Sequence, residues 1–213
     1  MNKIVIIGHG GFGREVKMLI DQINHKTQTY DLLGFYDDNE DSPSIIHGLK
    51  YLGKVNELSF IKSELNVVYG IGSPTVKEQL HKLLISNPNL YYPNLVHPSV
   101  IIGQDNVKMG IGNILCAGSI VTVDVSIGNF NTINLMCSVG HDTIIGDFCS
   151  LMPSVNVSGE VILEDKVYLG TGCKVINQVK IGACSTIGAG AVVTRDIPSH
   201  CTAVGVPARP LKS

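Results

Sequence analysis

The sequence lacks a strong excess of either charge, and it lacks any long apolar run. Its 16 lysines and arginines nearly balance 18 aspartates and glutamates, which leaves a formal net charge of −2. This balance argues against a surface for nucleic acid or for an anionic membrane. No apolar stretch reaches the roughly 18 residues that a membrane-spanning helix needs, and Met1 to Lys3 lead into an expected strand rather than a signal peptide. We therefore expect a soluble, cytoplasmic protein.

Charged residues are scarce overall, and the cysteines show no paired spacing. Charged residues make up 16% of the chain, against roughly a quarter in typical soluble domains. A low fraction is expected where stacked elements hide much of their surface. The six cysteines include no CxxC pair, so we expect buried, reduced thiols rather than disulfides or metal ligands.

A six-residue period runs through the second half of the chain. From Met109 to Val193, every sixth residue is aliphatic or methionine, without interruption. The series is Met109, Leu115, Val121, Ile127, Ile133, Val139, Ile145, Leu151, Val157, Leu163, Leu169, Val175, Ile181, Ile187 and Val193. A period of six fits neither a helix nor an alternating strand. It is the signature of hexapeptide repeats in a β-helix, in which the aliphatic side chains point inward and stack.

Small residues occupy set places in each repeat. The fourth residue after the aliphatic one is usually small or β-branched, as at Cys137, Cys149 and Cys173, and should fill the remaining interior. Glycine often follows the aliphatic residue directly, as at Gly140 and Gly170. We expect these glycines to adopt turn dihedrals that a Cβ would oppose.

The first ninety-odd residues instead alternate strands and helices. Strands are expected at 3–7, 32–36 and 66–69, with one helix after the first strand and another at 75–86. This alternation predicts a parallel sheet. We therefore expect an α/β Rossmann-like half-domain over 1–95 and an all-β β-helix over 96–213, with a first coil near Val100 that is out of phase with the ladder.

A glycine-rich turn ends the first strand. Gly8, Gly10 and Gly13 satisfy the GxGxxG pattern, and Asp37 lies where a ribose-binding acid would stand, a combination that suggests NAD. However, about 95 residues hold only half of a dinucleotide fold. A mononucleotide, or a nucleotide attached to a small group, fits better at the start of the helix. A role for the glycines in packing alone remains open.

His141 is the residue best placed for acid–base chemistry. It occupies the third place of its repeat, which should face outward near a corner, and Asp142 follows it. A histidine pKa near 6.5 suits proton removal at neutral pH, although a solvated surface histidine is the alternative. Zinc would need about three converging histidines, which the adjoining coils lack. A cysteine nucleophile is disfavoured because Cys137 should point inward, so we expect no metal and no covalent intermediate.

Several short motifs follow one another in a fixed order along nearly the whole chain. They are Gly8 to Gly13, Asp37-Asp38, Val139-Gly140-His141-Asp142, Ile145-Gly146-Asp147-Phe148, Ser158-Gly159, Leu169-Gly170-Thr171-Gly172, Ile187 to Ala191, and Gly205 to Arg209. In this order they resemble the bacterial sugar acetyltransferases of the sialic acid O-acetyltransferase-like (NeuD) family. The resemblance implies a left-handed β-helix, a homotrimer, and acetyl-CoA bound in the groove between neighbouring prisms.

The resemblance also implies roles for individual residues. His141 would be the catalytic base, and Asp142 would modulate its basicity. The nucleotide-linked sugar would contact Gly10, Gly11, Phe12, Asp37, Asp38, Gly72 and Thr75, and Asn134 would hold the acceptor. The acetyl-CoA groove would be lined by Ser150, Gly159, Thr171 and Ala189. Some relatives carry histidine at the positions of Phe12 and Ser150, so these two contacts would differ here.

The implied reaction is N-acetylation of the 4-amino group of a dTDP- or UDP-linked 4-amino-4,6-dideoxy sugar, for a bacterial surface glycan such as lipopolysaccharide or for a glycoprotein. The backbone N–H of Gly159, one coil beyond His141, would stabilise the oxyanion. O-acetylation of sialic acid or another sugar would use the same base and cofactor. A third possibility is a non-catalytic trimer that binds nucleotide sugars, although the His141-Asp142 pair argues against it.

Overall fold

The computed structural model describes residues 1–39 and 41–211, and the chain forms two compact units. The first unit is Met1–Pro98 and the second is Ser99–Ser213. The division falls a few residues beyond the boundary suggested by the sequence. Among the described residues, no helix is both long enough and apolar enough to cross a membrane.

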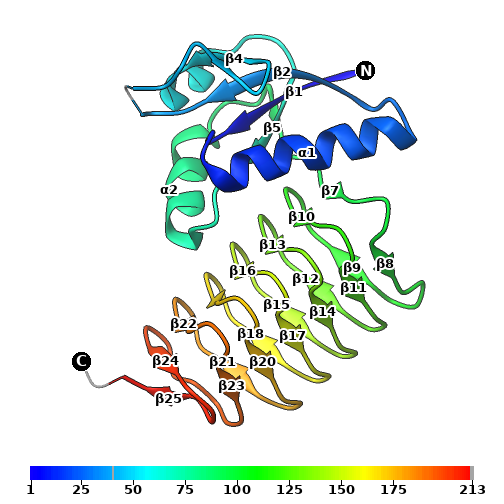
Figure 1. The fold of residues 1–213 in the computed structure, drawn as a ribbon, viewed down its shortest axis with the longest axis vertical. Coiled ribbons are helices and arrows are strands. Elements are labelled where there is room, and N and C mark those ends of the chain that lie inside the picture. The colour runs from blue at the N-terminus through cyan, green and yellow to red at the C-terminus, as the bar shows by residue number, and fades with distance from the viewer. Residues whose placement is uncertain (40, 212–213) are drawn as a thin grey trace. The chain divides into compact units, whose positions relative to one another are not determined.

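The first unit is built on one six-stranded sheet (Figure 1). Its elements are β1 (Asn2–Ile7), α1 (Gly11–Lys26), β2 (Tyr30–Tyr36), β3 (Ile45–Ile46), β4 (Leu49–Gly53), the 3₁₀ helix η1 (Val55–Phe60), β5 (Leu65–Tyr69), α2 (Pro74–Leu84) and β6 (Leu90–Tyr91). The strand order is β3-β4-β2-β1-β5-β6, and only the β3–β4 pair is antiparallel. The expected parallel α/β arrangement is therefore confirmed.

The central position of β1 explains its composition. Residues 4–7 of this strand are all buried, as expected for a parallel strand with a neighbour on each edge and apolar packing on both faces. Helix α1 buries Val16, Leu19 and Ile20, which share one face at helical spacing. The additional elements β3, β4, β6 and η1 are short or lack a clear period, so the sequence did not predict them.

The second unit is a parallel β-solenoid whose strands are mostly two residues long. The strands are β8 (Ile101–Ile102), β9 (Lys108–Met109), β10 (Ile114–Leu115), β11 (Ile120–Val121), β12 (Ser126–Ile127), β13 (Thr132–Ile133), β14 (Ser138–Val139), β15 (Ile144–Ile145), β16 (Ser150–Leu151), β17 (Asn156–Val157), β18 (Ile162–Leu163), β19 (Tyr168–Leu169), β20 (Lys174–Val175), β21 (Lys180–Ile181), β22 (Thr186–Ile187), β23 (Val192–Val193), β24 (Thr202–Val204) and β25 (Arg209–Pro210). One further strand, β7 (Leu95–Val96), precedes the division between the units. The expected hexapeptide β-helix is confirmed.

Successive strands take turns on three faces of the solenoid. The first face contains β10, β13, β16, β19, β22 and β24, the second contains β8, β11, β14, β17, β20 and β23, and the third contains β9, β12, β15, β18 and β21. We call the turns that leave the first face the first edge (residues 116–119, 134–137, 152–155, 170–173 and 188–191) and those that leave the second face the second edge (122–125, 140–143, 158–161 and 176–179). Figure 1 shows the labelled strands of the first face following one another along the stack.

The aliphatic ladder forms the interior of these coils. Val139 pairs with Val121 on one side and Val157 on the other, so residues one coil apart are separated by eighteen positions. Each member of the ladder is the second residue of its strand, and all from Leu115 onward are buried. At the start, Val121 pairs with Ile102, which confirms that the first coil is out of phase by one residue.

The glycines that follow the ladder residues have a different role from the one expected. Neither Gly140 nor Gly170 has a positive φ. A Cβ on Gly140 would lie 2.6 Å from the Gly159 nitrogen, and one on Gly170 would lie 2.6 Å from the Ala189 nitrogen. The expectation of special turn dihedrals at these positions is therefore wrong. These residues are glycine because the next coil passes so close, and the positive φ falls two residues later, as at Asp142 (58°).

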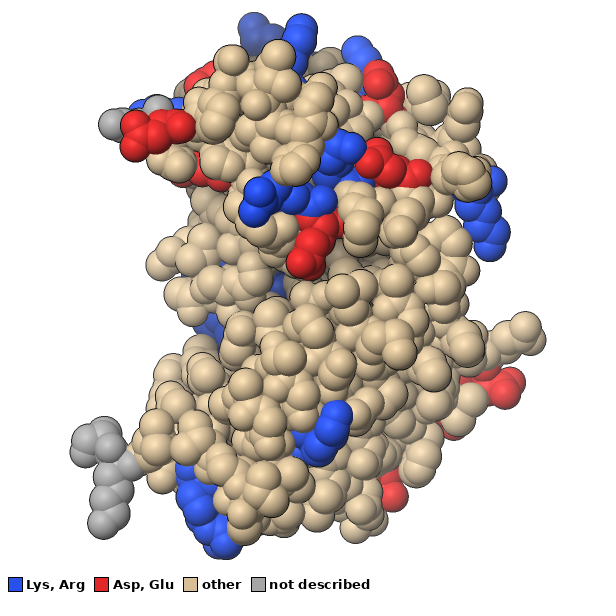
Figure 2. Space-filling model, viewed as in Figure 1, with Lys and Arg blue, Asp and Glu red and all other residues tan. Residues whose placement is uncertain are grey.

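The cysteines at inward repeat positions are buried, as expected, but two others are not. Cys116, Cys137, Cys149 and Cys173 are buried free thiols, whereas Cys184 and Cys201 are half-buried. Few charged side chains are visible on the solenoid unit in Figure 2. The low charge content of the chain is thus apparent on the visible face of the coils.

Candidate active site

His141 lies on the second edge of the solenoid, directly after β14 and Gly140. Its Nδ1 lies 2.8 Å from Oδ2 of Asp142, and both side chains are more than half exposed, at 58% and 57%. An ionised carboxylate only accepts hydrogen bonds, so Nδ1 carries the hydrogen. In the neutral imidazole this leaves Nε2 with its lone pair, which is the state that a general base requires.

Gly159 lies one coil beyond His141, and the imidazole ring occupies the space that its side chain would take. A Cβ on Gly159 would lie 2.5 Å from both Cε1 and Nε2 of the ring. The next residue, Glu160, donates its N–H to the His141 carbonyl at 2.8 Å, which fixes the register of the two turns. The Gly159 N–H has no acceptor within the described part of the chain. A proton acceptor and an unused hydrogen-bond donor therefore lie side by side.

A column of carboxylates that was not expected from the sequence flanks this histidine. Asp124, Asp142 and Glu160 occupy equivalent turn positions on three successive coils, all with positive φ. Asn106 donates to Asp124 at 2.9 Å, and Gln178 donates to Glu160 at 3.0 Å, so amide side chains close both ends of the column. The signal in the sequence is the eighteen-residue spacing of acids, which becomes visible once the coil length is known.

The residues expected to line the acetyl-CoA groove are divided between two edges and one face. Gly159 lies on the second edge beside His141. Thr171 and Ala189 lie on the first edge, exposed and one coil apart, where the Gly190 N–H donates to the Thr171 carbonyl at 2.8 Å. Ser150 lies on the first face in β16, and its buried hydroxyl has no partner among the described residues. One copy of the solenoid therefore does not bring Thr171 and Ala189 to the edge that carries His141.

Asn134 is largely occupied by its own turn. It lies on the first edge with an exposed fraction of 4%, and its Oδ1 accepts the Leu135 N–H at 2.7 Å. Its main-chain carbonyl accepts the Ser119 hydroxyl, also at 2.7 Å. This side chain thus stabilises the turn in the single chain, and any contact with an acceptor would use its remaining amide hydrogens.

In the α/β unit, the glycine turn combines packing with open space. A Cβ on Gly13 would collide with the Gly8 carbonyl oxygen, so this glycine is required for α1 to approach β1. Gly10 and Gly11, by contrast, have open space where a side chain would be. Helix α1 begins at Gly11 with no acidic residue in its first turn, and the N-terminal end of such a helix attracts anions. Phe12 follows in this turn and is half-buried.

A cavity of about 180 Å³ lies beside this turn. It is lined by Ile7, Gly8, Asp37, Asp38, Val55, Ile71, Val76 and Leu80. Ile7 and Gly8 lie at the end of β1, Asp37 and Asp38 follow β2, and Val55 begins η1. The others belong to the loop after β5 and to α2. The chain order of the strands reverses at β1, since β2 lies on one side of it and β5 on the other. Crevices at such switch points are the usual ligand sites of open α/β sheets. Gly72 and Thr75 lie in the same loop and helix but do not line this cavity; their neighbours Ile71 and Val76 do.

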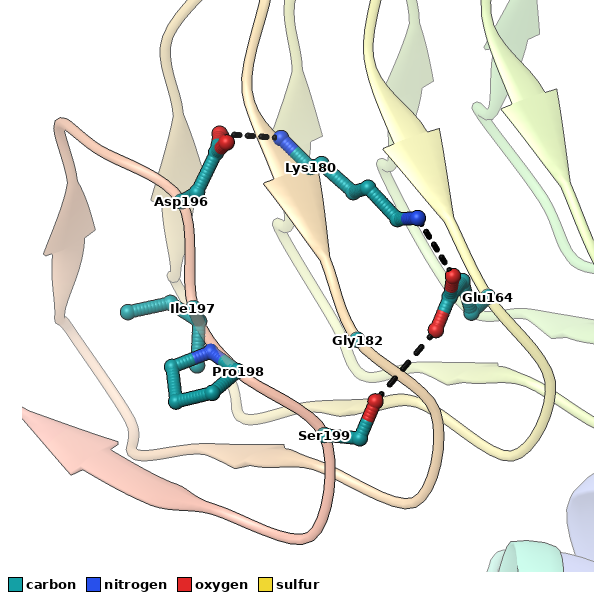
Figure 3. Close-up of a pocket in the computed structure, with 7 residues that line it drawn as sticks. All are labelled: Glu164, Lys180, Gly182, Asp196, Ile197, Pro198 and Ser199. Carbon is teal, nitrogen blue, oxygen red and sulfur yellow. Dashed lines mark hydrogen bonds and ion pairs between the residues drawn. The ribbon is translucent and has the colours of Figure 1, made fainter.

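A second hollow, of about 400 Å³, lies on the third face of the solenoid (Figure 3). Lys180 Nζ contacts Glu164 at 2.6 Å, and this hydrogen bond is the main reason that the pKa of Glu164 is lowered. The other Glu164 oxygen accepts the Ala183 N–H at 2.8 Å and the Ser199 hydroxyl at 3.4 Å. The Lys180 N–H is in turn bound by Asp196 at 2.8 Å. These contacts fasten the segment around Asp196 and Ser199 to the last coils.

Within residues 1–39 and 41–211, no group of three or more His, Cys, Asp or Glu side chains could hold a metal ion.

Two family models match the chain. Residues 3–84 match the PglD N-terminal domain, and residues 160–195 match the bacterial transferase hexapeptide repeats. The chain is 29% identical to the GDP-perosamine N-acetyltransferase of Escherichia coli O157:H7 over 100% of its own length and 97% of that protein. It is 31% identical to the UDP-3-O-acylglucosamine N-acyltransferase of Methylorubrum extorquens (strain PA1). That alignment includes 53% of this chain and only 32% of the longer relative.

Solved structures agree over the whole chain. The acetyltransferase domain of PglB from Neisseria gonorrhoeae FA1090, in complex with acetyl coenzyme A, aligns with a TM-score of 0.88 and 25% identity, covering 99% of this chain and 100% of that one. PerB from Caulobacter crescentus, in complex with CoA and GDP-perosamine, aligns with a TM-score of 0.86 and 29% identity, covering 100% of this chain and 98% of that one.

Proposed function

Because this chain belongs to the sialic acid O-acetyltransferase-like (NeuD) family of hexapeptide-repeat sugar acetyltransferases, we propose that it transfers an acetyl group from acetyl-CoA to the 4-amino group of a nucleotide-linked 4-amino-4,6-dideoxy sugar. Relatives that align over the whole chain are named as sugar N-acetyltransferases or are solved with CoA and an amino sugar. The product would enter a bacterial surface glycan such as lipopolysaccharide, or a glycoprotein.

The observation that carries this proposal is the pairing of His141 with Gly159. The neutral amine attacks the thioester carbonyl carbon, while Nε2 of His141 accepts the proton that the amine loses. The oxyanion of the tetrahedral intermediate accepts a hydrogen bond from the Gly159 N–H, a donor with no other partner in the described chain. When the C–S bond breaks, the histidine returns its proton to the thiolate, so that amide and CoA thiol are the products.

Asp142 supports this sequence by orientation. Its 2.8 Å contact with Nδ1 holds the imidazole in one tautomer, and its negative charge stabilises the imidazolium that forms during the reaction. The neighbouring carboxylates of Asp124 and Glu160 add negative charge at the same edge. This environment stabilises the positive charge that develops on the nitrogen as the neutral amine attacks.

A homotrimer accounts for the division of the groove residues between edges. Thr171 and Ala189 lie on the first edge and His141 on the second, so a groove that contains all three would form where the first edge of one copy meets the second edge of another. In such a seam, the position of each substrate would contribute much of the rate acceleration.

The nucleotide would bind in the cavity of the α/β unit. The open N-terminal end of α1 at Gly10 and Gly11 suits a diphosphate, and the cavity beside Asp37 and Asp38 suits the nucleoside. From the sequence we favour dTDP or UDP. GDP joins them as a candidate because the relatives from Escherichia coli and Caulobacter crescentus act on or bind GDP-perosamine.

The test is thiol release from acetyl-CoA with a panel of acceptors. The panel contains UDP-, dTDP- and GDP-linked 4-amino-dideoxy sugars, free sialic acid and serine, and mass spectrometry locates the acetyl group. We expect release with one nucleotide amino sugar and an amide product. In His141→Ala the rate should fall about 10²–10⁴-fold while acetyl-CoA binding is retained. Release only with sialic acid would move the assignment to O-acetylation. Acetyl-CoA binding without release to any acceptor would mean that the proposed acceptor class is wrong.

A further inference from the structure

His9, in the glycine turn, is hydrogen-bonded to the segment that follows β2. Its Nε2 lies 2.7 Å from Oγ of Ser42, and the Ser42 hydroxyl donates its own hydrogen to the Asn39 carbonyl at 2.6 Å. A hydroxyl has one hydrogen, so Ser42 accepts at this contact and His9 donates. The direction of the hydrogen bond is therefore determined: Nε2–H of His9 points at Ser42, in either charge state of the ring.

Both oxygens of the Asp37 carboxylate accept main-chain N–H groups within the same cluster. Its Oδ2 accepts the main-chain N–H of His9 at 2.9 Å, and its Oδ1 accepts that of Asn39, also at 2.9 Å. The side chains of His9 and Asp37 are mostly buried, with exposed fractions of 16% and 21%. Asp37 therefore joins the glycine turn to the segment after β2, and its Oδ2 lies 3.7 Å from Nε2 of His9, the atom that contacts Ser42.

Asp38 differs from its neighbour in having an unused oxygen. Its Oδ1 accepts the Val55 N–H at 2.9 Å at the start of η1, and its Oδ2 has no partner among the residues that the structure describes. Asp38 lines the cavity together with Gly8. The two adjacent acids therefore have separate roles: Asp37 holds the backbone, and Asp38 offers an acceptor to a ligand.

We propose that His9 is a positioning residue for the nucleotide, and this inference rests on the proposed function. Its hydrogen bond to Ser42 holds Asp37, Asn39 and Ser42 against the glycine turn. As a result, the free oxygen of Asp38 faces the cavity and accepts a hydrogen bond from the nucleoside of a bound nucleoside diphosphate. His9 itself touches none of the reacting atoms.

The test compares His9→Ala with His9→Gln in the full chain. Binding of UDP, dTDP and GDP is measured by calorimetry, and KM and kcat are measured with the preferred amino sugar. In His9→Ala, loss of the hydrogen bond to Ser42 should weaken diphosphate binding about tenfold and raise KM to a similar extent. The value of kcat should stay within about twofold of the wild-type value. In His9→Gln the amide N–H reaches Ser42 and should restore most of the affinity. Ser42→Ala should weaken binding as His9→Ala does, and the double variant should be no worse than either single one.

Matched controls separate positioning from a general loss of structure. The exposed His25 near the end of α1, replaced by alanine, should leave diphosphate binding unchanged. Acetyl-CoA binding and the unfolding temperature should be retained in all variants; if His9→Ala fails to fold, Ser42→Ala and His9→Gln carry the test.

Several outcomes would overturn the proposal. One is an unchanged affinity for the nucleoside diphosphate in both His9→Ala and Ser42→Ala. Another is a fall in kcat of His9→Ala with KM unchanged. If the wild type binds a diphosphate but transfers no acetyl group, the proposed function fails while the binding comparison for His9 still stands. If the wild type binds none of the three diphosphates, the nucleotide assignment of the cavity is wrong and the role of His9 falls with it.

Discussion

At the scale of single residues, the candidate active site depends on one missing side chain. His141 has an orienting carboxylate in Asp142, but its ring position is set by Gly159 on the next coil. The glycine serves twice, since its lack of a Cβ admits the imidazole and its N–H is left without a partner in the described chain.

We therefore expect Gly159→Ala to reduce kcat about 10²–10³-fold, comparable to the loss of an oxyanion donor. The added Cβ would displace the ring, because it would lie 2.5 Å from Nε2. Steady-state kinetics and acetyl-CoA binding distinguish a lost transition-state contact from lost cofactor affinity. Asn177 occupies the same place one coil further on and is exposed; Asn177→Ala should leave kcat nearly unchanged. A Gly159→Ala enzyme of normal activity would rule out this arrangement of the ring.

At the scale of the coil, close stacking sets the composition of the turns. A Cβ on Gly146 would collide with the Asp165 side chain and lie 2.9 Å from the Asp165 nitrogen. The same carboxylate accepts the Asp147 N–H at 2.8 Å, so neighbouring coils are joined by a bond that the new methyl group would disturb.

Gly146→Ala should lower the free energy of unfolding by about 1–3 kcal/mol, as overpacking does in well-packed interiors. Urea denaturation measures the change. Gly11→Ala is the control, because a Cβ there meets nothing within 4 Å, and it should leave stability unchanged or raise it by up to about 1 kcal/mol. Equal stabilities for the wild type and Gly146→Ala would contradict the steric explanation.

The interior of the coil also determines how the thiols titrate. Burial raises the pKa of Cys137 to about 11 and that of Cys173 to about 12. Below about pH 8.5 the thiol is protonated in both the folded and the unfolded chain. At higher pH only the unfolded chain ionises, so the free energy of unfolding falls until the pH exceeds the folded pKa.

We expect this loss to reach on the order of 2 kcal/mol per buried thiol by about pH 10.5. Urea denaturation from pH 7.5 to 10.5 measures it. Cys173→Ala should make the decline with pH shallower, whereas the same replacement at the half-buried Cys184 should change it less. Identical slopes for these two variants would contradict the assignment to burial.

At the scale of the whole molecule, the candidate site is divided between two edges of the solenoid. His141 and Gly159 lie on one edge, and Thr171 and Ala189 lie on the other. An active site that uses both edges requires a second copy of the chain, which predicts a shared site and an obligate oligomer.

Two inactive variants should therefore complement each other. We expect His141→Ala and Thr171→Arg each to be inactive alone, and a mixed trimer to regain activity because about a third of its seams combine an intact His141 with an intact Thr171. Co-expression with two affinity tags, followed by the acetyl-transfer assay, measures this recovery, and sedimentation velocity gives the subunit number. A fully active monomer, or mixed trimers without activity, would place the site within one chain.

The six-residue period of the sequence was sufficient to predict the solenoid, because an interior ladder tolerates one kind of residue at a fixed spacing. The alternation of apolar strands with helices was likewise sufficient to predict the parallel sheet of the α/β unit, and His141 stood out because its repeat position faces outward. Tertiary structure decided the rest. Whether Gly140 is needed for its dihedrals or for a neighbouring backbone depends on how close the coils lie. Whether Asp37 or Asp38 has an oxygen free to accept a hydrogen bond from a ligand depends on which oxygens already accept main-chain N–H groups. Both are properties of atoms brought together by folding, and residue order alone does not contain them.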